Sequence, residues 1–346
     1  MFSEIENKKV YVYCLASVVT GGCELLHQLV SFLNDNGREA YIVYVGEGNK
    51  EIPKEYKMYN IRTASSIVDS DESIVVIDEG FMYLVSKIHY AHCIFWWLSV
   101  DNFFLDPCQL PFHTLSNLYS WNMRTFLRGI RKRFSNFFHH IDCSPKFSIN
   151  ELREKKAFNA YQSEYARLFL QEKGFSNIVP LKDYINIDFI THGLLEKEDI
   201  VLYNPKKGFS FTKRLMEMAP NIKWVPLINL TRRQMLEKFQ IAKVYIDFGN
   251  HPGKDRIPRE AALNRCVVIT GKRGSANNDV DIPIPNKYKF DEKYVENQSV
   301  IKMIDHVFAN FTVCLQEQSD YRTQILKEKK EFEQQIRDLF RIEIVV

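Results

Sequence analysis

Apolar runs alternate with amphipathic segments along most of this 346-residue chain. Residues 8–16, 38–46, 73–80 and 93–102 are runs rich in β-branched and aromatic side chains, whereas residues 23–37 repeat leucine and valine at helical spacing. Strands that are apolar almost throughout are typical of parallel sheets covered by helices on both faces. We therefore predict an α/β fold built on a parallel sheet.

The same alternation starts again in the second half of the chain, after the polar segment 188–199. The pattern predicts strands at 199–205, 222–228, 243–249 and 266–271, with helices at 210–220, 231–242 and 258–264. A chain of this length usually forms more than one domain. We predict an N-terminal Rossmann-like domain over 1–193, a second one over 194–320, and a helical tail over 321–346.

Acidic residues and glycines gather where the predicted strands of the first domain end. Ligands of parallel α/β sheets bind beyond the carboxyl ends of the strands. This places Gly21, Gly22, Asp78 and Asp101 on the ligand edge of the first domain. Each of the two aspartates could act as a catalytic base or position an acceptor, and capping of a helix is the structural alternative for both.

Two loops of the second domain are rich in cations. Lys206 and Lys207 stand before a predicted helix, whose N-terminus attracts anions, although a solvated basic turn is the alternative. Neither G-x-x-x-x-G-K-[ST] nor G-x-G-x-x-G is present, which disfavours a P-loop enzyme and a dehydrogenase.

The second loop, "GNHPGKDRIPRE" at 249–260, has the highest density of charge between two apolar strands. Lys254 and Arg256 are suited to a phosphate, and Arg259 either binds phosphate or pairs with a carboxylate. Glu260 could accept hydrogen bonds from ribose hydroxyls or pair with a neighbouring arginine. His251 could contact the sugar or the phosphate, and a structural histidine is the alternative.

Composition and charge bear on the kind of ligand that the protein binds and on the cellular compartment in which it works. The net charge of +3 is too small to indicate a nucleic-acid-binding protein. Seven scattered cysteines without a C-x-x-C pair indicate a reducing cytoplasm, and neither a leader peptide nor a membrane span is expected. Residues 123–138 form a basic, aromatic amphipathic segment, which predicts either contact with the inner face of the membrane or a core-facing helix.

The arrangement resembles the GT-B glycosyltransferases, with two Rossmann-like domains facing across a cleft. Residues 20–44, "TGGCELLHQLVSFLNDNGREAYIVY", look like their opening glycine loop, helix and second strand, and "REAALNRCVVITGKRGS" at 259–275 looks like the donor-binding segment of the large retaining group. The resemblance implies that Glu260 holds the donor ribose and that Lys206 and Lys207 hold its diphosphate. The group usually has a second glutamate eight positions before Glu260, where this chain has Pro252.

The resemblance implies a glycosyltransferase of bacterial surface polysaccharide synthesis, with a nucleoside-diphosphate sugar as donor and a glycan acceptor, lipid-linked if the membrane interpretation holds. We expect no permanent cofactor and no metal, and we favour retention of configuration. The alternatives are a catalytically silent sugar-nucleotide-binding partner and a GT-B-like epimerase. The predicted catalytic residues are Asp101, Asp78 and His251, and the predicted donor-binding residues are Gly21, Gly22, Lys206, Lys207, Gly253, Lys254, Asp255, Arg256, Arg259, Glu260, Gly274 and Ser275.

Overall fold

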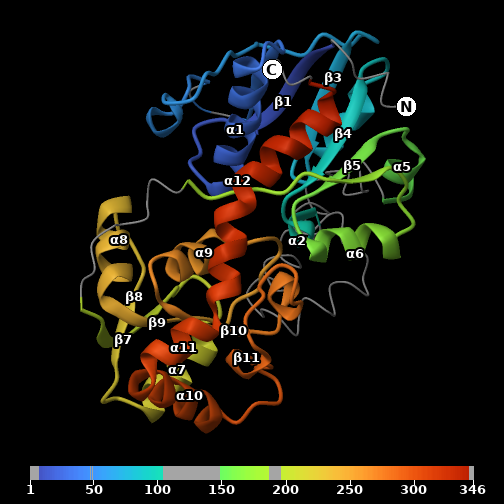
Figure 1. Cartoon of the computed structure of the whole chain (residues 1–346). Coiled ribbons are helices and arrows are strands. Elements are labelled where there is room, and N and C mark those ends of the chain that lie inside the picture. Colours follow the sequence, from blue (N-terminus) through green and yellow to red (C-terminus); the bar gives the residue numbers. More distant parts are fainter. Residues whose placement is uncertain (1–7, 47, 49, 104–148, 187–195, 343–346) are drawn as a thin grey trace, which may run out of the picture. The chain divides into compact units, whose positions relative to one another are not determined.

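The computed structural model describes residues 8–46, 48, 50–103, 149–186 and 196–342 (Figure 1). The chain divides into two compact units. Unit 1 contains residues 1–162, 166–181 and 334–346, and unit 2 contains residues 163–165 and 182–333. The predicted boundary at 193/194 lies within residues 187–195, which are outside the described residues, so it stays a prediction.

Unit 1 is built on a parallel six-stranded sheet. Its strands are β1 (Lys9–Leu15), β2 (Ala40–Val45), β3 (Ser73–Asp78), β4 (His92–Trp97), β5 (Phe158–Tyr161) and β6 (Ile178–Pro180). Its helices are α1 (Gly21–Asp35), η2 (Lys54–Tyr56), η3 (Met82–Lys87), α2 (Val100–Phe103), α5 (Ile149–Glu154) and most of α6 (Glu164–Glu172). Helix α1 begins at the N-cap Thr20, whose side chain accepts a hydrogen bond from the amide of Cys23.

Strand order fixes where a ligand can enter unit 1. The order is β2-β1-β3-β4-β5-β6. Strand β2 therefore lies on one side of β1, and the chain then crosses over to place β3 on the other side. Such a reversal opens a crevice beyond the carboxyl ends of the two strands concerned. In unit 1 this point lies beyond Leu15 and Asp78, the last residues of β1 and β3.

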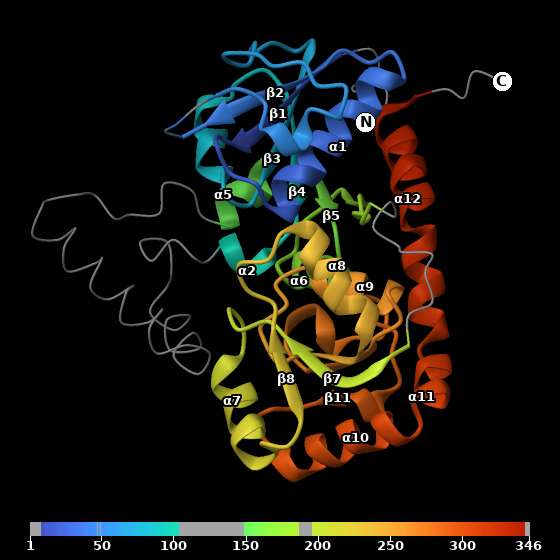
Figure 2. The same cartoon turned by 90° about the vertical axis from the view of Figure 1, so that its left-hand side faces the viewer.

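Unit 2 repeats the plan with a parallel five-stranded sheet. Its strands are β7 (Glu198–Tyr203), β8 (Lys223–Pro226), β9 (Ala242–Asp247), β10 (Val267–Gly271) and β11 (Lys289–Phe290). Its helices are α7 (Phe209–Met218), α8 (Arg232–Ile241), α9 (Arg256–Leu263), η5 (Gly274–Asn277), η6 (Asn286–Tyr288), α10 (Asn297–Ala309), α11 (Phe311–Glu317) and the first part of α12 (Ser319–Phe340) (Figure 2).

The strand order of unit 2 is β11-β10-β9-β7-β8, so its reversal lies between β7 and β9. The loops that follow these strands are 204–208 and 248–255, the two cationic loops singled out from the sequence. The topology therefore brings both loops to the one position of the sheet edge that favours a ligand.

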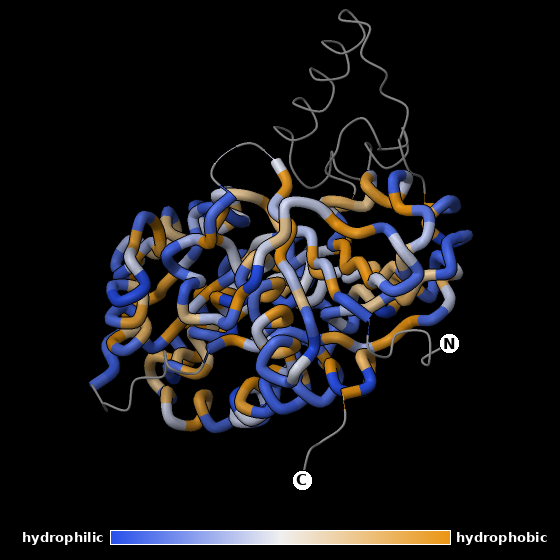
Figure 3. The backbone as a smooth tube through the Cα atoms, turned by 90° about the horizontal axis from the view of Figure 1, so that it is seen from above, coloured by the Kyte–Doolittle hydropathy of each residue, from blue (hydrophilic) through white to orange (hydrophobic). Residues whose placement is uncertain are grey.

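Both cores follow the hydrophobic pattern of the chain. The central strands are buried almost completely, as in β3, where Ile74, Val75, Val76 and Ile77 are inaccessible to solvent. Polar residues lie mainly on the peripheral helices and loops (Figure 3). The predicted α/β class with two parallel sheets is confirmed.

A buried glutamine completes the sheet of unit 2. Strand β11 is only two residues long and pairs with Thr270 and Gly271, so it does not reach Val268 of β10. The side chain of Gln318 takes the place of a longer strand, because its Oε1 accepts from the amide of Val268 at 2.9 Å and its Nε2 donates to the carbonyl at 2.8 Å. The amide side chain thus satisfies two buried backbone groups that would otherwise be unpaired.

We predict that Gln318→Leu destabilises unit 2 by about 2–4 kcal/mol, because each unpaired buried backbone group costs about 1–3 kcal/mol and part of this is recovered by relaxation. Hydrogen exchange of the β10 amides would measure the loss. Gln316→Leu is the matched control, since Gln316 is exposed two residues earlier in the chain. Equal protection of β10 in the two variants would show that Gln318 is not needed to complete the sheet.

Candidate functional site

Two loops of unit 2 are packed against each other at the reversal point. Gly208, with φ of 59°, is the N-cap of α7, and a Cβ at this position would lie 2.3 Å from the carbonyl oxygen of Phe248. A Cβ on Gly249 would lie 2.3 Å from Cβ of Lys207. These glycines are therefore required for the close approach of the loops, which places Lys207 directly beside the loop 248–255.

Four ionisable side chains meet between these loops. Nδ1 of His251 lies 3.0 Å from Oδ2 of Asp255, and its Nε2 lies 3.5 Å from Oδ1 of Asp247. The ammonium of Lys207 is 2.6 Å from the same Oδ2 of Asp255. His251 and Asp247 are buried, whereas Lys207 is 31% exposed. We call Lys207, Asp247, His251 and Asp255 the loop cluster.

The carboxylates of the loop cluster favour protonation of His251, and the cationic groups favour ionisation of Asp255. Burial lowers the pKa of His251, but the carboxylates of Asp247 and Asp255 outweigh burial and raise this pKa above its ordinary value. Burial also opposes ionisation of Asp255, and the nearby His251 together with the charge of Lys207 nevertheless lowers its pKa to about 2. The loop cluster therefore favours ionised carboxylates and a protonated His251.

The donor atoms of Asp247, His251 and Asp255 lie within 4.8 Å of one another, a spacing that a metal ion could also use. Their other contacts favour an ion-pair network. Asp247 accepts hydrogen bonds from the hydroxyl of Tyr245 at 2.8 Å and from the amide of Gly249 at 3.0 Å, and Asp255 accepts from Lys207. Both carboxylates thus already have partners, one of them a cation, as an ion-pair network requires.

The loop after β10 is hydrogen-bonded to the loop that carries His251. The amide of Ser275 donates to the carbonyl of His251 at 2.8 Å, and the hydroxyl of Ser275 donates to the carbonyl of Gly253 at 2.7 Å. Gly274 has a φ of 57°, and a Cβ there would lie 2.0 Å from the carbonyl oxygen of His251. Gly253, Gly274 and Ser275, predicted to approach the donor, thus join the loops through buried backbone contacts.

Lys254 and Arg259 both lie beside buried carboxylates, which is one of the two alternatives that the sequence left open for Arg259. Lys254 Nζ is 2.6 Å from Oε1 of Glu328, and Nη1 of Arg259 is 2.8 Å from Oε2 of the same carboxylate. Arg259 also pairs with Asp183 and is 1% exposed. Both cations have a structural role in unit 2, since they are buried beside carboxylates that neutralise them, and the phosphate contact of Lys254 stays a prediction.

Glu260 is also buried and lies near two arginines. Nη1 of Arg232, on α8, is 2.6 Å from Oε1 of Glu260, and Nε of Arg256 is 3.8 Å from the same oxygen. Glu260 is 2% exposed, and its Oε2 has no hydrogen-bond partner among the described residues. The pairing with Arg256 was one of the two alternatives for Glu260, whereas Arg232 carried no signal in the sequence.

Glu292 is a further acidic residue at this sheet edge. It follows β11, its side chain is 6% exposed, and its Oε2 lies 2.6 Å from Nη2 of Arg273. Burial raises its pKa to about 7 against the effect of Arg273. Sequence reasoning missed Glu292 because β11 is too short to be predicted, and so the strand end that carries Glu292 was not visible.

The predicted residues of unit 1 lie at the carboxyl edge of its sheet, and Gly21, Gly22 and Asp78 lie at the reversal point. Gly21 and Gly22 open α1, directly after β1, and Asp78 ends β3. Burial raises the pKa of Asp78 to about 7, although its Oδ1 accepts a hydrogen bond from the amide of Gly80. Asp101 lies in α2, which follows β4, the strand beside β3. Both aspartates therefore stand at the carboxyl edge of the sheet.

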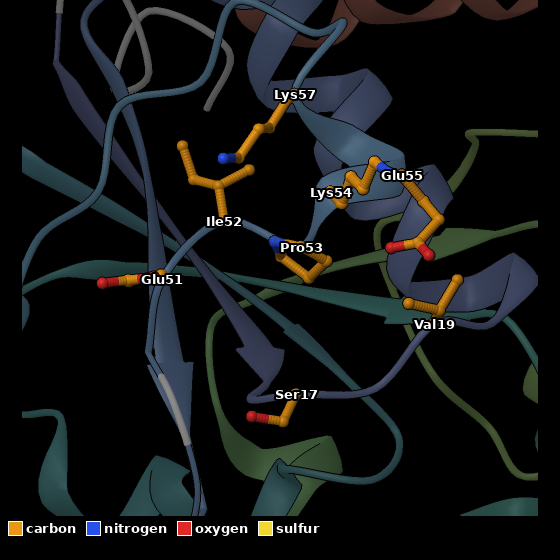
Figure 4. Close-up of a pocket in the computed structure, with 8 residues that line it drawn as sticks. All are labelled: Ser17, Val19, Glu51, Ile52, Pro53, Lys54, Glu55 and Lys57. Carbon is orange, nitrogen blue, oxygen red and sulfur yellow. The ribbon is translucent and has the colours of Figure 1, made fainter.

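A cavity of about 370 Å³ opens beside this edge of unit 1 (Figure 4). It lies between the loop that follows β1 and the segment around η2. Its lining combines two carboxylates, two ammonium groups, a hydroxyl and three apolar side chains. The lining residues are Ser17, Val19, Glu51, Ile52, Pro53, Lys54, Glu55 and Lys57. Such a mixture can donate and accept hydrogen bonds at several positions of one ligand.

The basic segment 123–138 lies outside the described residues. Among the helices that the structure does describe, none is both long enough and apolar enough to cross a membrane.

Comparison with solved structures identifies the fold. The chain is similar to sucrose-phosphate synthase from Thermosynechococcus elongatus, with a TM-score of 0.64, 10% identity, and coverage of 96% of this chain and 98% of that chain. It is similar to HepE from Anabaena, crystallised in complex with UDP-glucose, with a TM-score of 0.59, 10% identity, and coverage of 96% and 99%. These are GT-B glycosyltransferases, so the predicted GT-B fold is confirmed.

An α-glucosyltransferase solved with UDP and a 13-mer DNA is a third structure of this kind, with a TM-score of 0.51, 10% identity, and coverage of 96% and 99%. No protein-family model and no curated protein matches the sequence. At identities of 10%, the likeness concerns the fold, and the function has to be argued from the site.

We predict that Lys254→Met lowers the stability of unit 2 by about 3–5 kcal/mol, because Glu328 would remain buried with part of its counter-charge removed. The control is Lys206→Met, since Lys206 is exposed on the neighbouring loop. Urea unfolding followed by hydrogen exchange in β9 would measure both variants. A Lys254→Met protein as stable as wild type would show that the pair with Glu328 does not stabilise unit 2, and would favour a ligand-binding role for Lys254.

Proposed function

We propose that this protein is a glycosyltransferase that moves a sugar from a nucleoside-diphosphate sugar to a glycan acceptor. The observation that carries the proposal is the position of Lys207 at the β7/β9 reversal of unit 2, next to the N-termini of α7 and α9. Helix N-termini and a partly exposed ammonium together favour a diphosphate. The solved structures with UDP or UDP-glucose have the same fold, which supports this choice of ligand.

The reaction requires stabilisation of a leaving diphosphate. The oxygen of an acceptor hydroxyl forms a bond to the anomeric carbon, and the bond from this carbon to the diphosphate oxygen breaks. Lys207, the exposed Lys206 and the N-terminal amides of α7 would stabilise the negative charge of the diphosphate. Glu260, through its Oε2, is our candidate for accepting hydrogen bonds from the ribose hydroxyls.

The acceptor side is proposed in unit 1. Hydroxyl groups of a sugar can donate to Glu51 and Glu55 and accept from Lys54 and Lys57 in the 370 Å³ cavity. If the reaction inverts configuration, Asp78 or Asp101 would take the proton of the acceptor hydroxyl; if it retains configuration, neither has to act as a base. A lipid-linked acceptor of a bacterial surface polysaccharide is the finer proposal, supported by the basic segment 123–138.

Nucleotide binding is the first test. We expect one of UDP, GDP, dTDP, ADP and CMP to raise the midpoint of thermal unfolding, since a ligand at a hundred times its dissociation constant stabilises the native state by about 2.7 kcal/mol. Lys207→Ala and Glu260→Gln should lose most of this shift, and Lys213→Ala, an exposed lysine on α7, should keep it. The absence of a shift with all five nucleotides would contradict the proposed donor site.

The catalytic role of Asp78 has a pH signature. If Asp78 is the base, it must be ionised, so kcat/KM for the acceptor should fall as the pH drops below about 7, where burial places its pKa. Asp78→Asn should then reduce acceptor-dependent release of nucleoside diphosphate by at least about a hundredfold, in line with the usual contribution of general-base catalysis. An active Asp78→Asn enzyme whose product retains the donor configuration would exclude Asp78 as the base.

A further inference from the structure

The sequence left two roles open for His251, contact with the sugar or the phosphate and a structural role, and its side chain is completely buried within unit 2. Both ring nitrogens face carboxylates, Nδ1 toward Asp255 and Nε2 toward Asp247. Both nitrogens are within ion-pair distance of a carboxylate, and neither meets hydrogen-bond geometry with any group among the described residues. A neutral imidazole carries one N–H and one lone pair, so it would direct a lone pair at one of the two carboxylates. The arrangement is satisfied only when both nitrogens carry protons.

We propose that His251 is a positioning residue which, as an imidazolium ion, bridges Asp247 and Asp255 and thereby keeps the ammonium of Lys207 available to an anionic ligand. The two carboxylates of the loop cluster need balancing positive charge. With His251 charged, the loop cluster holds two cations, and half of the negative charge is balanced without Lys207. With His251 neutral, Lys207 is the one cation of the loop cluster that is left to balance both carboxylates. The effect on ligand binding by Lys207 rests on the proposed donor site, whereas the charge state of His251 does not.

The groups that face His251 come from four parts of unit 2. Asp247 ends β9, Asp255 is the N-cap of α9, and Lys207 belongs to the loop between β7 and α7. Glu292, after β11, adds a more distant acidic group, which is paired with Arg273. Apart from Lys207 and the already paired Arg273, the groups that act on His251 are acidic, so the surroundings favour the imidazolium.

The protonation state can be measured in the intact wild-type protein. The ring-nitrogen chemical shifts of ¹⁵N-histidine-labelled protein distinguish an imidazolium from either neutral tautomer, and the His251 signals are assigned by their absence in His251→Gln. The raised pKa means that the imidazolium is fully formed at low pH and is lost as the pH rises through that value. We expect two protonated nitrogens at pH 7. A neutral ring at pH 7 would overturn the proposal.

The coupling to Lys207 predicts a pH dependence of binding. The dissociation constant of the nucleoside diphosphate that binds best should rise roughly tenfold as the pH passes through the pKa of His251, the size of a one-unit coupling between two charges. In His251→Gln, affinity should be weaker already at pH 7 and should change less with pH. His306→Gln is the control, because His306 is an exposed histidine of α10 in the same unit.

The outcomes separate the inference from the proposed function. An imidazolium at pH 7 with pH-independent nucleotide binding would overturn the coupling to Lys207 and leave the donor site intact. A failure of all nucleotides to bind would refute the donor site and the coupling with it, while the nitrogen shifts would still decide the charge of His251. Titration with Mg²⁺, Mn²⁺ and Zn²⁺ completes the test. A metal that binds tightly to wild type and not to His251→Gln would show that the loop cluster is a metal centre instead.

Discussion

The candidate site of unit 2 depends on the neutralisation of two carboxylates, the buried Asp247 and the partly exposed Asp255. Both stand at the reversal of strand order between β7 and β9, where a parallel sheet opens toward a ligand. An unpaired buried carboxylate would shift its pKa or prevent the loops from closing. His251 and Lys207 supply the two positive charges, and the glycines beside them allow the backbones to approach closely enough for the four groups to meet.

A second ion-pair network in unit 2 connects buried elements with one another. Lys254 and Arg259 share the carboxylate of Glu328 on α12, and Arg259 reaches Asp183 as well. These contacts connect α9 with segments far away in the sequence. One charged loop therefore contributes both to the candidate ligand edge, through His251 and Asp255, and to the interior, through Lys254 and Arg259.

The fold could be predicted from the sequence because hydrophobic periodicity and strand-like runs determine a parallel sheet with covering helices. The structure places β1, β3, β9 and α1 where the pattern indicates them. The residues of the site were harder to predict, since burial and pairing depend on partners that are distant in the chain. Arg259 and Lys206 look alike in the sequence, yet one is buried against two carboxylates and the other is exposed. Asp247 could have been found, because it is the acidic residue near the end of the predicted strand 243–249, whereas Arg232 and Glu292 carried no such signal.

The central claim is that the β7/β9 edge of unit 2 binds the diphosphate of a nucleotide. A crystal structure of the protein grown with the nucleoside diphosphate that binds best would test it most directly. A phosphate should lie within hydrogen-bond distance of Nζ of Lys207 and of the amides that begin α7. A nucleotide bound elsewhere on the protein, with Lys207 still donating to Asp255 and to the carbonyl of Asn250, would contradict this assignment of the donor site.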